Sequence, residues 1–236
     1  MQAPHGIASR FAVAALALAA VGVAGPASAQ PARSIPNAVL VVETAPGTPG
    51  SDPAGAPPRL VLLSDGQVFV GGTGRLDTGR LEKGEAQALR RGADAARKAA
   101  GRGGLVALGG DERRAVRLRF PEDEPREVTV TGDPAAAPPA LQAVAAFVSQ
   151  ALAFEHPGLG RYAPTGYALS AREGRLAGGC RPWRFPFAIE DALAAPRLVE
   201  AADAEGWPTG GWPASVCAGE KRYVVTLRPL LPGEQP

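Results

Sequence analysis

"RLVLLSDGQVFVGG", residues 59–72, is the stretch that decides the fold class of this chain. Two apolar runs flank the dipeptide Asp65–Gly66, a pair that tolerates the positive φ angles of a type I′ turn. We therefore expect a β-hairpin with strands near residues 59–64 and 67–72.

The segments on either side of this hairpin differ in character. Residues 38–43 (AVLVVE) are almost continuously apolar and rich in β-branched side chains, which predicts another strand. Residues 44–58 are rich in Pro and Gly, so we expect a loop. Residues 82–100 have a helical period, because apolar side chains recur at steps of three and four residues: Ala86, Leu89, Ala93, Ala96 and Ala100.

A second hairpin and a second helix follow. Residues 114–120 (RAVRLRF) and 126–131 (REVTVT) alternate strictly around the turn PEDEP, and we expect their inward face to carry Val116, Leu118, Phe120, Val128 and Val130. Residues 138–154 predict a well-buried helix. Residues 38–160 thus read hairpin, helix, hairpin, helix. The predicted fold is α+β, with an antiparallel sheet built from hairpins and two main helices on one face.

Residues 161–236 differ from the rest, because all Trp, Tyr and Cys residues lie there. We expect a strand at 165–171, a short helix at 188–195, a second short helix that starts at Pro196, and a last strand at 221–230. This region forms either a subdomain or an extension of the same sheet.

The two cysteines, Cys180 and Cys217, predict a disulfide, since an even count in an exported chain favours pairing. Two free thiols or half of a metal site are the alternatives. There is no CxxC motif, and His156 is the only histidine after the N-terminal segment. We predict no metal site and no cofactor.

The first residues have the layout of a secretory signal peptide. Arg10 precedes an apolar run from Phe11 to Ala24, and Ala27-Ser28-Ala29 supplies the small-residue cleavage site. We expect residues 1–29 to be removed and residues 30–37 to form a flexible lead. An uncleaved N-terminal anchor is the alternative. The predicted location is the periplasm or the extracellular space.

Charge excludes some partners. Loss of residues 1–29 removes only one charged residue, Arg10, so the formal net charge falls from +2 to +1. A balance of this kind gives no global field for nucleic acid. We also expect no transmembrane segment after the signal is removed.

Within the second hairpin, Arg117 and Arg119 are expected on the solvent face, paired with Glu124 and Glu127.

Candidate catalytic groups are few. Nucleophilic hydrolysis needs a nucleophile, a base and an orienting group, and no GxSxG motif is present. His156 follows the second predicted helix, where a cation interacts well with the helix dipole, so a structural role is the simpler interpretation. The acidic residues at 122–124 and 190–191 suit a solvated turn and a helix N-terminus.

The aromatic residues of the last third are the strongest candidates for binding. Trp207 and Trp212 lie in a Pro/Gly-rich loop between the cysteines, and Trp183 follows Cys180. Flat rings on a rigid loop could bind a glycan or a peptide. The alternative is that these rings pack around the disulfide as a small core.

The ending "KRYVVTLRPLLPGE", residues 221–234, resembles a family of uncharacterised exported proteins from GC-rich bacteria, in which a last strand ends in an RPLLP-acid tail. The resemblance implies export, an α+β build and a structured C-terminus, and it transfers no catalytic residue. We expect Leu230 and Leu231 to fold back onto the body and only residues 233–236 to fray.

These observations favour an exported, non-enzymatic protein with a binding or structural role at the cell envelope or outside the cell. One alternative is a protease-inhibitor-like module that presents the Pro/Gly loop 44–58. Another is a hydrolase with an unrecognised site, which predicts a pocket that holds His156 beside a carboxylate and a hydroxyl.

Overall fold

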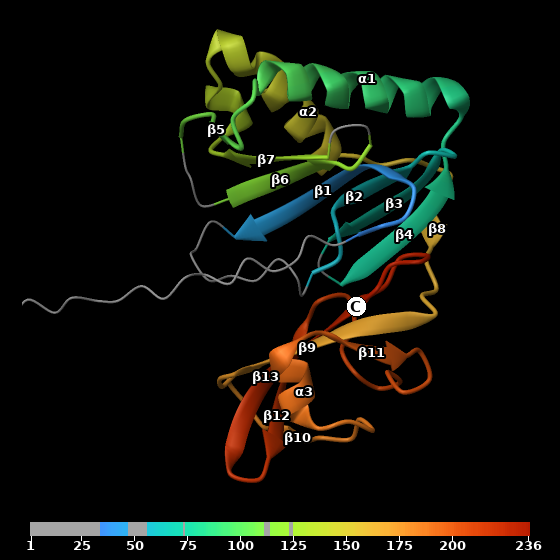
Figure 1. Ribbon diagram of the computed structural model, residues 1–236, viewed down its shortest axis with the longest axis vertical. Coiled ribbons are helices and arrows are strands. Elements are labelled where there is room, and N and C mark those ends of the chain that lie inside the picture. The colour runs from blue at the N-terminus through green and yellow to red at the C-terminus, as the bar shows by residue number, and fades with distance from the viewer. Residues whose placement is uncertain (1–33, 47–55, 73, 111–113, 123–124) are drawn as a thin grey trace, which may run out of the picture. The chain divides into compact units, whose positions relative to one another are not determined.

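The computed structural model describes residues 34–46, 56–72, 74–110, 114–122 and 125–236, which form two sheets (Figure 1). The first sheet has eight strands in the order β5-β7-β6-β1-β2-β3-β4-β8, and the second has five in the order β10-β12-β13-β9-β11. Three α-helices accompany them. The predicted mixed class of helices and sheets is confirmed. The predicted signal peptide lies outside the described residues.

The first sheet is built around β1, which pairs antiparallel with both β2 and β6. Its strands are β1 (Ala38–Pro46), β2 (Leu60–Leu63), β3 (Gln67–Gly72), β4 (Arg75–Arg80), β5 (Leu105–Ala107), β6 (Arg114–Phe120), β7 (Arg126–Thr131) and β8 (Gly160–Arg161). The edge strand β5 runs parallel to β7, so this sheet is not wholly antiparallel.

The β2–β3 hairpin forms where the sequence predicts it, but its turn is of another type. Gly66 has φ +86°, whereas Asn37 is the only non-glycine residue with positive φ in the described part of the chain. Asp65 therefore keeps a negative φ, and the Gly66 amide donates to the Leu63 carbonyl at 3.1 Å. This is a type I turn closed by a left-handed glycine, and not the expected type I′ turn.

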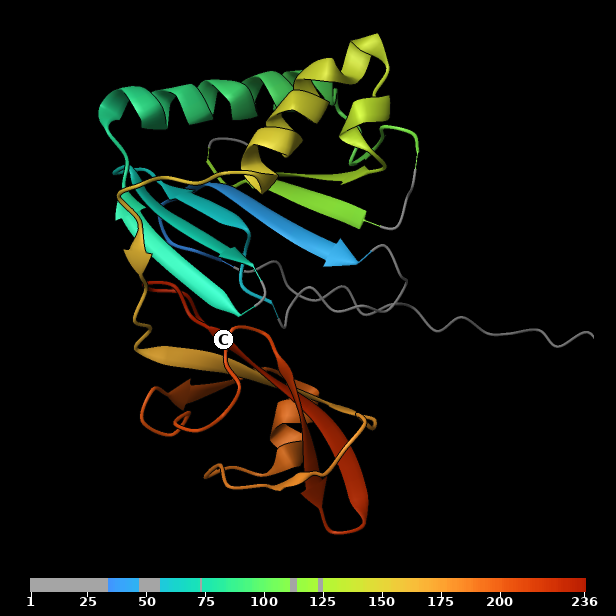
Figure 2. The ribbon, with the colours of Figure 1, turned by 180° about the vertical axis from the view of Figure 1, so that it is seen from behind.

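The helices α1 (Lys83–Ala99) and α2 (Gln142–Leu152) lie on the same side of the first sheet in both views (Figures 1 and 2). They approach closely at Gly92, where an added Cβ would lie 3.2 Å from the Phe147 ring. The helix expected from residue 138 begins later, at Gln142. The prolines before it form two short 3₁₀ turns, Pro134–Ala136 and Pro139–Leu141.

Alternation along the strands divides the core between the two faces of the first sheet. Leu60, Leu62 and Val68 pack with the helices, whereas Val61 and Phe69 face the other side. The predicted inward residues of the second hairpin all belong to the helix-facing cluster: Val116, Leu118, Phe120, Val128 and Val130.

Two arginines on β6 behave differently from one another. Arg117 is partly exposed, and its Nε lies 3.0 Å from Glu127 Oε1, as the cross-strand pattern suggests. Arg119, expected on the solvent face, is instead buried, and its Nη2 donates to Glu43 Oε1 at 2.9 Å. Burial of this guanidinium follows from the neighbouring β1 carboxylate, which the local pattern of β6 does not reveal. Glu124, the other expected partner, lies outside the described residues.

The second sheet consists of β9 (Gly166–Glu173), β10 (Arg181–Pro182), β11 (Arg197–Glu200), β12 (Pro213–Ala218) and β13 (Lys221–Pro229). The short helix α3 (Ile189–Ala194) packs into its core through Ile189 and Ala192. The helix expected from Pro196 is wrong, because the chain enters β11 there and pairs antiparallel with β9.

The predicted Cys180–Cys217 disulfide is confirmed, with a Cα–Cα distance of 5.5 Å and a sequence separation of 37. Next to it, β10 pairs parallel with β12, where Pro182 lies opposite Cys217. The bridge thus attaches the long connection before α3 to the hairpin formed by β12 and β13.

Both ends of the described chain pack against the first sheet. Ile35 is buried although the segment 30–37 was expected to be flexible, and residues 30–33 lie outside the described part. Leu231 joins the same cluster on the face away from α1 and α2. Glu234 is also buried, so the fraying expected for residues 233–236 does not extend to it.

Candidate functional site

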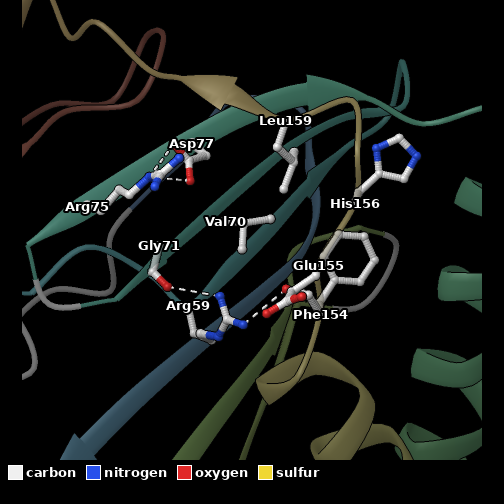
Figure 3. Close-up of a pocket in the computed structure, with 9 residues that line it drawn as sticks. All are labelled: Arg59, Val70, Gly71, Arg75, Asp77, Phe154, Glu155, His156 and Leu159. Carbon is white, nitrogen blue, oxygen red and sulfur yellow. Dashed lines mark hydrogen bonds and ion pairs between the residues drawn. The ribbon is translucent and has the colours of Figure 1, made fainter.

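A polar pocket of about 410 Å³ lies on the helix-bearing side of the first sheet (Figure 3). Its walls come from Arg59 just before β2, from β3 and β4, and from the segment that follows α2. The lining residues are Arg59, Val70, Gly71, Arg75, Asp77, Phe154, Glu155, His156 and Leu159. A volume of this size is typical of small-molecule sites.

The strand register explains why these groups meet. Val70 on β3 lies opposite Asp77 on β4. Arg75 and Asp77 are two residues apart on one strand, so their side chains share a face. Figure 3 shows Val70 between the Arg75–Asp77 end and the Arg59 end of the pocket.

Arg59 bonds the two walls together. Its Nε and Nη2 donate to the Leu152 carbonyl at 2.9 and 2.7 Å, and Nη2 also donates to the Phe154 carbonyl at 3.0 Å. Its Nη1 donates to the Gly71 carbonyl on β3 at 3.0 Å. The guanidinium thus caps the last carbonyls of α2 and holds the segment after the helix against the sheet.

An ion pair forms the opposite end of the pocket. Arg75 Nε lies 2.7 Å from Asp77 Oδ2, and the Arg75 side chain is 72% exposed against 16% for Asp77. Among the described residues the Asp77 carboxylate engages only Nε of this guanidinium, and the side chain as a whole is largely exposed. A donor and an acceptor are therefore presented side by side.

His156 is oriented by two neighbours. Its Nδ1 accepts from the Gly158 amide at 3.1 Å, so in the neutral ring the proton is on Nε2. Nε2 lies 3.4 Å from Glu85 Oε2 in the first turn of α1. The same Glu85 oxygen accepts from the Glu82 amide at 2.9 Å. The imidazole thus connects the pocket segment to the start of α1.

The constellation that a hydrolase would need is incomplete in this pocket. His156 does lie among carboxylates, with Asp77 and Glu155 in the same lining. None of the nine lining residues carries a hydroxyl or a thiol. The geometry therefore does not favour nucleophilic catalysis at His156.

The three tryptophans have different surroundings. Trp207 is buried in the core of the second sheet, with its ring centroid 4.8 Å from that of Phe185. Trp183 is half-buried against the same core, and its Nε1 donates to the Phe187 carbonyl at 2.7 Å. Trp212 is 52% exposed. Trp207 and Trp183 thus belong to an aromatic core, and only Trp212 presents a large open ring surface.

The Trp212 loop meets the β3–β4 turn. The Gly74 amide donates to the Gly210 carbonyl at 3.0 Å, and an added Cβ on Gly74 would lie 2.6 Å from Trp212 Nε1. Gly211 donates in turn to the Leu227 carbonyl at 3.1 Å. Gly74 directly precedes Arg75 in the chain, so the Trp212 loop contacts the neighbour of a residue that lines the pocket.

Other expected features carry no site. Most of the loop 44–58, on which the inhibitor alternative depends, lies outside the described residues, and its first residues continue β1. Glu190 and Asp191 lie in the first turn of α3. Among the described residues, no three His, Cys, Asp or Glu side chains cluster so as to hold a metal ion.

No helix in the described ranges has the length and apolar character required to cross a membrane. No protein-family model, curated protein or solved structure matches this chain. Its function must therefore be inferred from the pocket and from the exposed tryptophan.

Sequence reasoning found Trp212 but missed the pocket. Arg59 falls at the start of the predicted hairpin, whereas no strand is predicted for the stretch that carries Arg75 and Asp77. Had residues 75–80 been recognised as a strand, the alternation of Arg75, Leu76 and Asp77 would have placed both charges on one face. Nothing local indicates that the segment after α2 covers them.

Proposed function

We propose that this chain is an exported, soluble protein that binds a ligand in the polar pocket and catalyses no reaction there. Export is supported by the signal-like residues 1–29, and the Cys180–Cys217 disulfide is compatible with it. The inference about binding rests on the pocket itself.

The observation that carries the proposal is that the polar side chains of the pocket are held in place by hydrogen bonds and ion pairs within the protein. Arg59 is committed to three backbone carbonyls, and Asp77 is held by Arg75. His156 is held between Gly158 and Glu85. Groups fixed in this way give a preorganised surface, which lowers the entropic cost of binding. A catalytic base, by contrast, must be within reach of the proton it removes, with a nucleophile or water to activate.

A solution screen tests the proposal. Amino acids, dipeptides and mono- and oligosaccharides would be added to the full exported chain while backbone amide shifts are followed by ¹H–¹⁵N NMR. We expect at least one compound to shift the amides of Val70, Gly71 and Asp77. Asp77→Ala should weaken that binding about tenfold or more, because Arg75 loses the carboxylate that orients it.

The control is Asp94→Ala on α1. Asp94 also pairs with an arginine, Arg97 at 3.5 Å, but it does not line the pocket. Its removal should leave the affinity unchanged. Two results would contradict the proposal: binding that Asp77→Ala does not affect, and turnover of a p-nitrophenyl ester or glycoside that is abolished by His156→Ala.

A further inference from the structure

The pocket balances donors against acceptors. Arg59 and Arg75 each supply a guanidinium, and Asp77 and Glu155 each supply a carboxylate. Four of the five N–H groups of Arg59 donate to carbonyls, which leaves one on Nη1 within the described surroundings. Arg75 retains its Nη groups. A ligand in this pocket therefore meets hydrogen-bond donors and acceptors together.

This balance selects for a neutral ligand. A ligand anion that bound Arg75 would lie beside the Asp77 carboxylate, and a cation that bound Asp77 would lie beside the guanidinium. Either would gain one attraction and one repulsion of similar size. A hydroxyl both donates and accepts, so neighbouring hydroxyls can satisfy the two partners at once without breaking their ion pair.

The rest of the lining suits a ring with apolar edges. Val70 lies between the two charged ends, and Phe154 and Leu159 add apolar surface on the side toward His156 (Figure 3). A sugar ring has this composition, with C–H groups on its faces and hydroxyls around its rim. Its C–H face can pack on the apolar side chains while the hydroxyls reach Arg75 and Asp77.

Trp212 extends the surface beyond the pocket. The indole packs over Gly74, which leaves no room for a side chain at that position. Gly210, with φ +76°, comes so close to Gly74 that an added Cβ would lie 2.8 Å from the Gly74 Cα. The ring thus packs against the residue that precedes Arg75, and its exposed surface is offered to a further unit of a chain-like ligand.

We infer that the ligand is a neutral oligosaccharide, with one sugar unit in the pocket and an adjoining unit stacked on Trp212. The inference rests on the proposed binding function and adds the chemical class of the ligand. It assigns the pocket residues Arg75 and Asp77 to hydroxyl recognition and Trp212 to the second unit.

A glycan array of neutral and acidic oligosaccharides tests the class, and titration calorimetry then measures the best ligand against its own monosaccharide unit. We expect binding to at least one neutral oligosaccharide. Asp77→Ala should weaken both the oligosaccharide and the monosaccharide about tenfold or more. Trp212→Ala should weaken only the oligosaccharide, by a similar factor, because the monosaccharide does not reach the indole.

Leu105→Ala is the matched control for the tryptophan. Leu105 is also a large exposed apolar residue, 68% exposed, but it lies on β5 at the opposite edge of the same sheet from β4 and β8. Its removal should leave every affinity unchanged.

The outcomes separate the two proposals. If no neutral oligosaccharide binds, or if only acidic ones do, the inference is overturned. If a dipeptide from the NMR screen shifts the pocket amides and loses affinity in Asp77→Ala, the proposed binding function is supported and the inference of a sugar ligand is overturned. A neutral oligosaccharide whose affinity changes in neither Asp77→Ala nor Trp212→Ala binds elsewhere, and this result would overturn both.

Discussion

The charged residues of the C-terminal tail form a buried cluster. The side chains of Arg228 and Glu234 are 4% and 0% exposed, and Arg228 Nη1 lies 2.9 Å from Glu234 Oε1. Glu234 Oε2 also accepts from the Leu231 amide at 3.1 Å, and the Tyr162 hydroxyl donates to the Leu230 carbonyl at 3.0 Å. A buried charge is tolerated only when it is paired. Arg228 and Glu234 thus have a structural role as a buried ion pair, and the sequence alone does not reveal this role.

Tyr162 gives this cluster a measurable pH dependence. Burial raises the pKa of the Tyr162 phenol, and the nearby Glu234 carboxylate raises it further. A folded-state pKa above the unfolded value of about 10 stabilises the fold fully below that pH. The contribution is lost as the pH rises through the folded pKa.

Tyr162→Phe should therefore be less stable than the wild type by about 1 kcal/mol at pH 7, the value of one hydrogen bond. The difference should shrink as the pH rises above 10, since only the wild type loses the contribution of this phenol. Urea unfolding between pH 7 and 11.5 measures both effects. A difference that stays constant across this range would contradict the assignment.

At the scale of elements, the β2–β3 hairpin was predictable because its signal is local. Two apolar runs and Asp65–Gly66 suffice to place the turn, although the turn type depends on the whole loop. The strand β11 was not predictable in this way. A proline such as Pro196 suits both the first turn of a helix and the start of an edge strand, and only pairing with the distant β9 decides between them.

The hairpin turn makes a prediction about Gly66. Its φ of +86° is strained for any residue with a Cβ, whereas the space is adequate, since the added atom would lie 3.4 Å from the Leu81 carbonyl. Gly66→Ala should lower the free energy of unfolding by about 1–2 kcal/mol. The carboxylate of Asp65 still accepts from the Gln67 amide in this variant, so the loss reports on the backbone alone.

Gly84→Ala is the matched control in urea unfolding. Gly84 lies in α1 with no atom within 4 Å of an added Cβ and without a positive φ. The substitution should raise the free energy of unfolding by about 0.5–1 kcal/mol, because alanine loses less conformational freedom in a helix. If Gly66→Ala left the free energy of unfolding unchanged or raised it as Gly84→Ala does, the turn would not have the conformation described.

At the scale of the molecule, contacts between segments far apart in sequence decide both the site and the ending. The pocket is lined by residues from two distant segments, 59–77 and 154–159. No local sequence pattern predicts that these segments lie side by side. The tail continues from β13, a central strand of the second sheet, to Leu231, which packs on the face of the first sheet that lies away from α1 and α2. The segment from β13 to Leu231 therefore contributes side chains to both cores, which makes the last residues part of the fold.

Removal of residues 230–236 should accordingly be severe. The chain would lose the burial of Leu230 and Leu231, about 1.5–3 kcal/mol each, and Arg228 would be left buried without its partner, at about 3–5 kcal/mol. A loss of about 6 kcal/mol or more is comparable with the whole stability of an ordinary domain. The melting temperature should fall by at least about 12 °C, as followed by circular dichroism.

Two further chains separate the causes of this loss. Removal of Gln235 and Pro236 alone, both exposed, should leave the melting temperature within about 1 °C of the full chain. Arg228→Met in the truncated chain removes the unpaired charge but restores no packing, so it should recover part of the lost stability. Recovery of all of it would mean that Leu230 and Leu231 contribute nothing. A melting temperature unchanged by removal of residues 230–236 would show that the tail does not join the two cores.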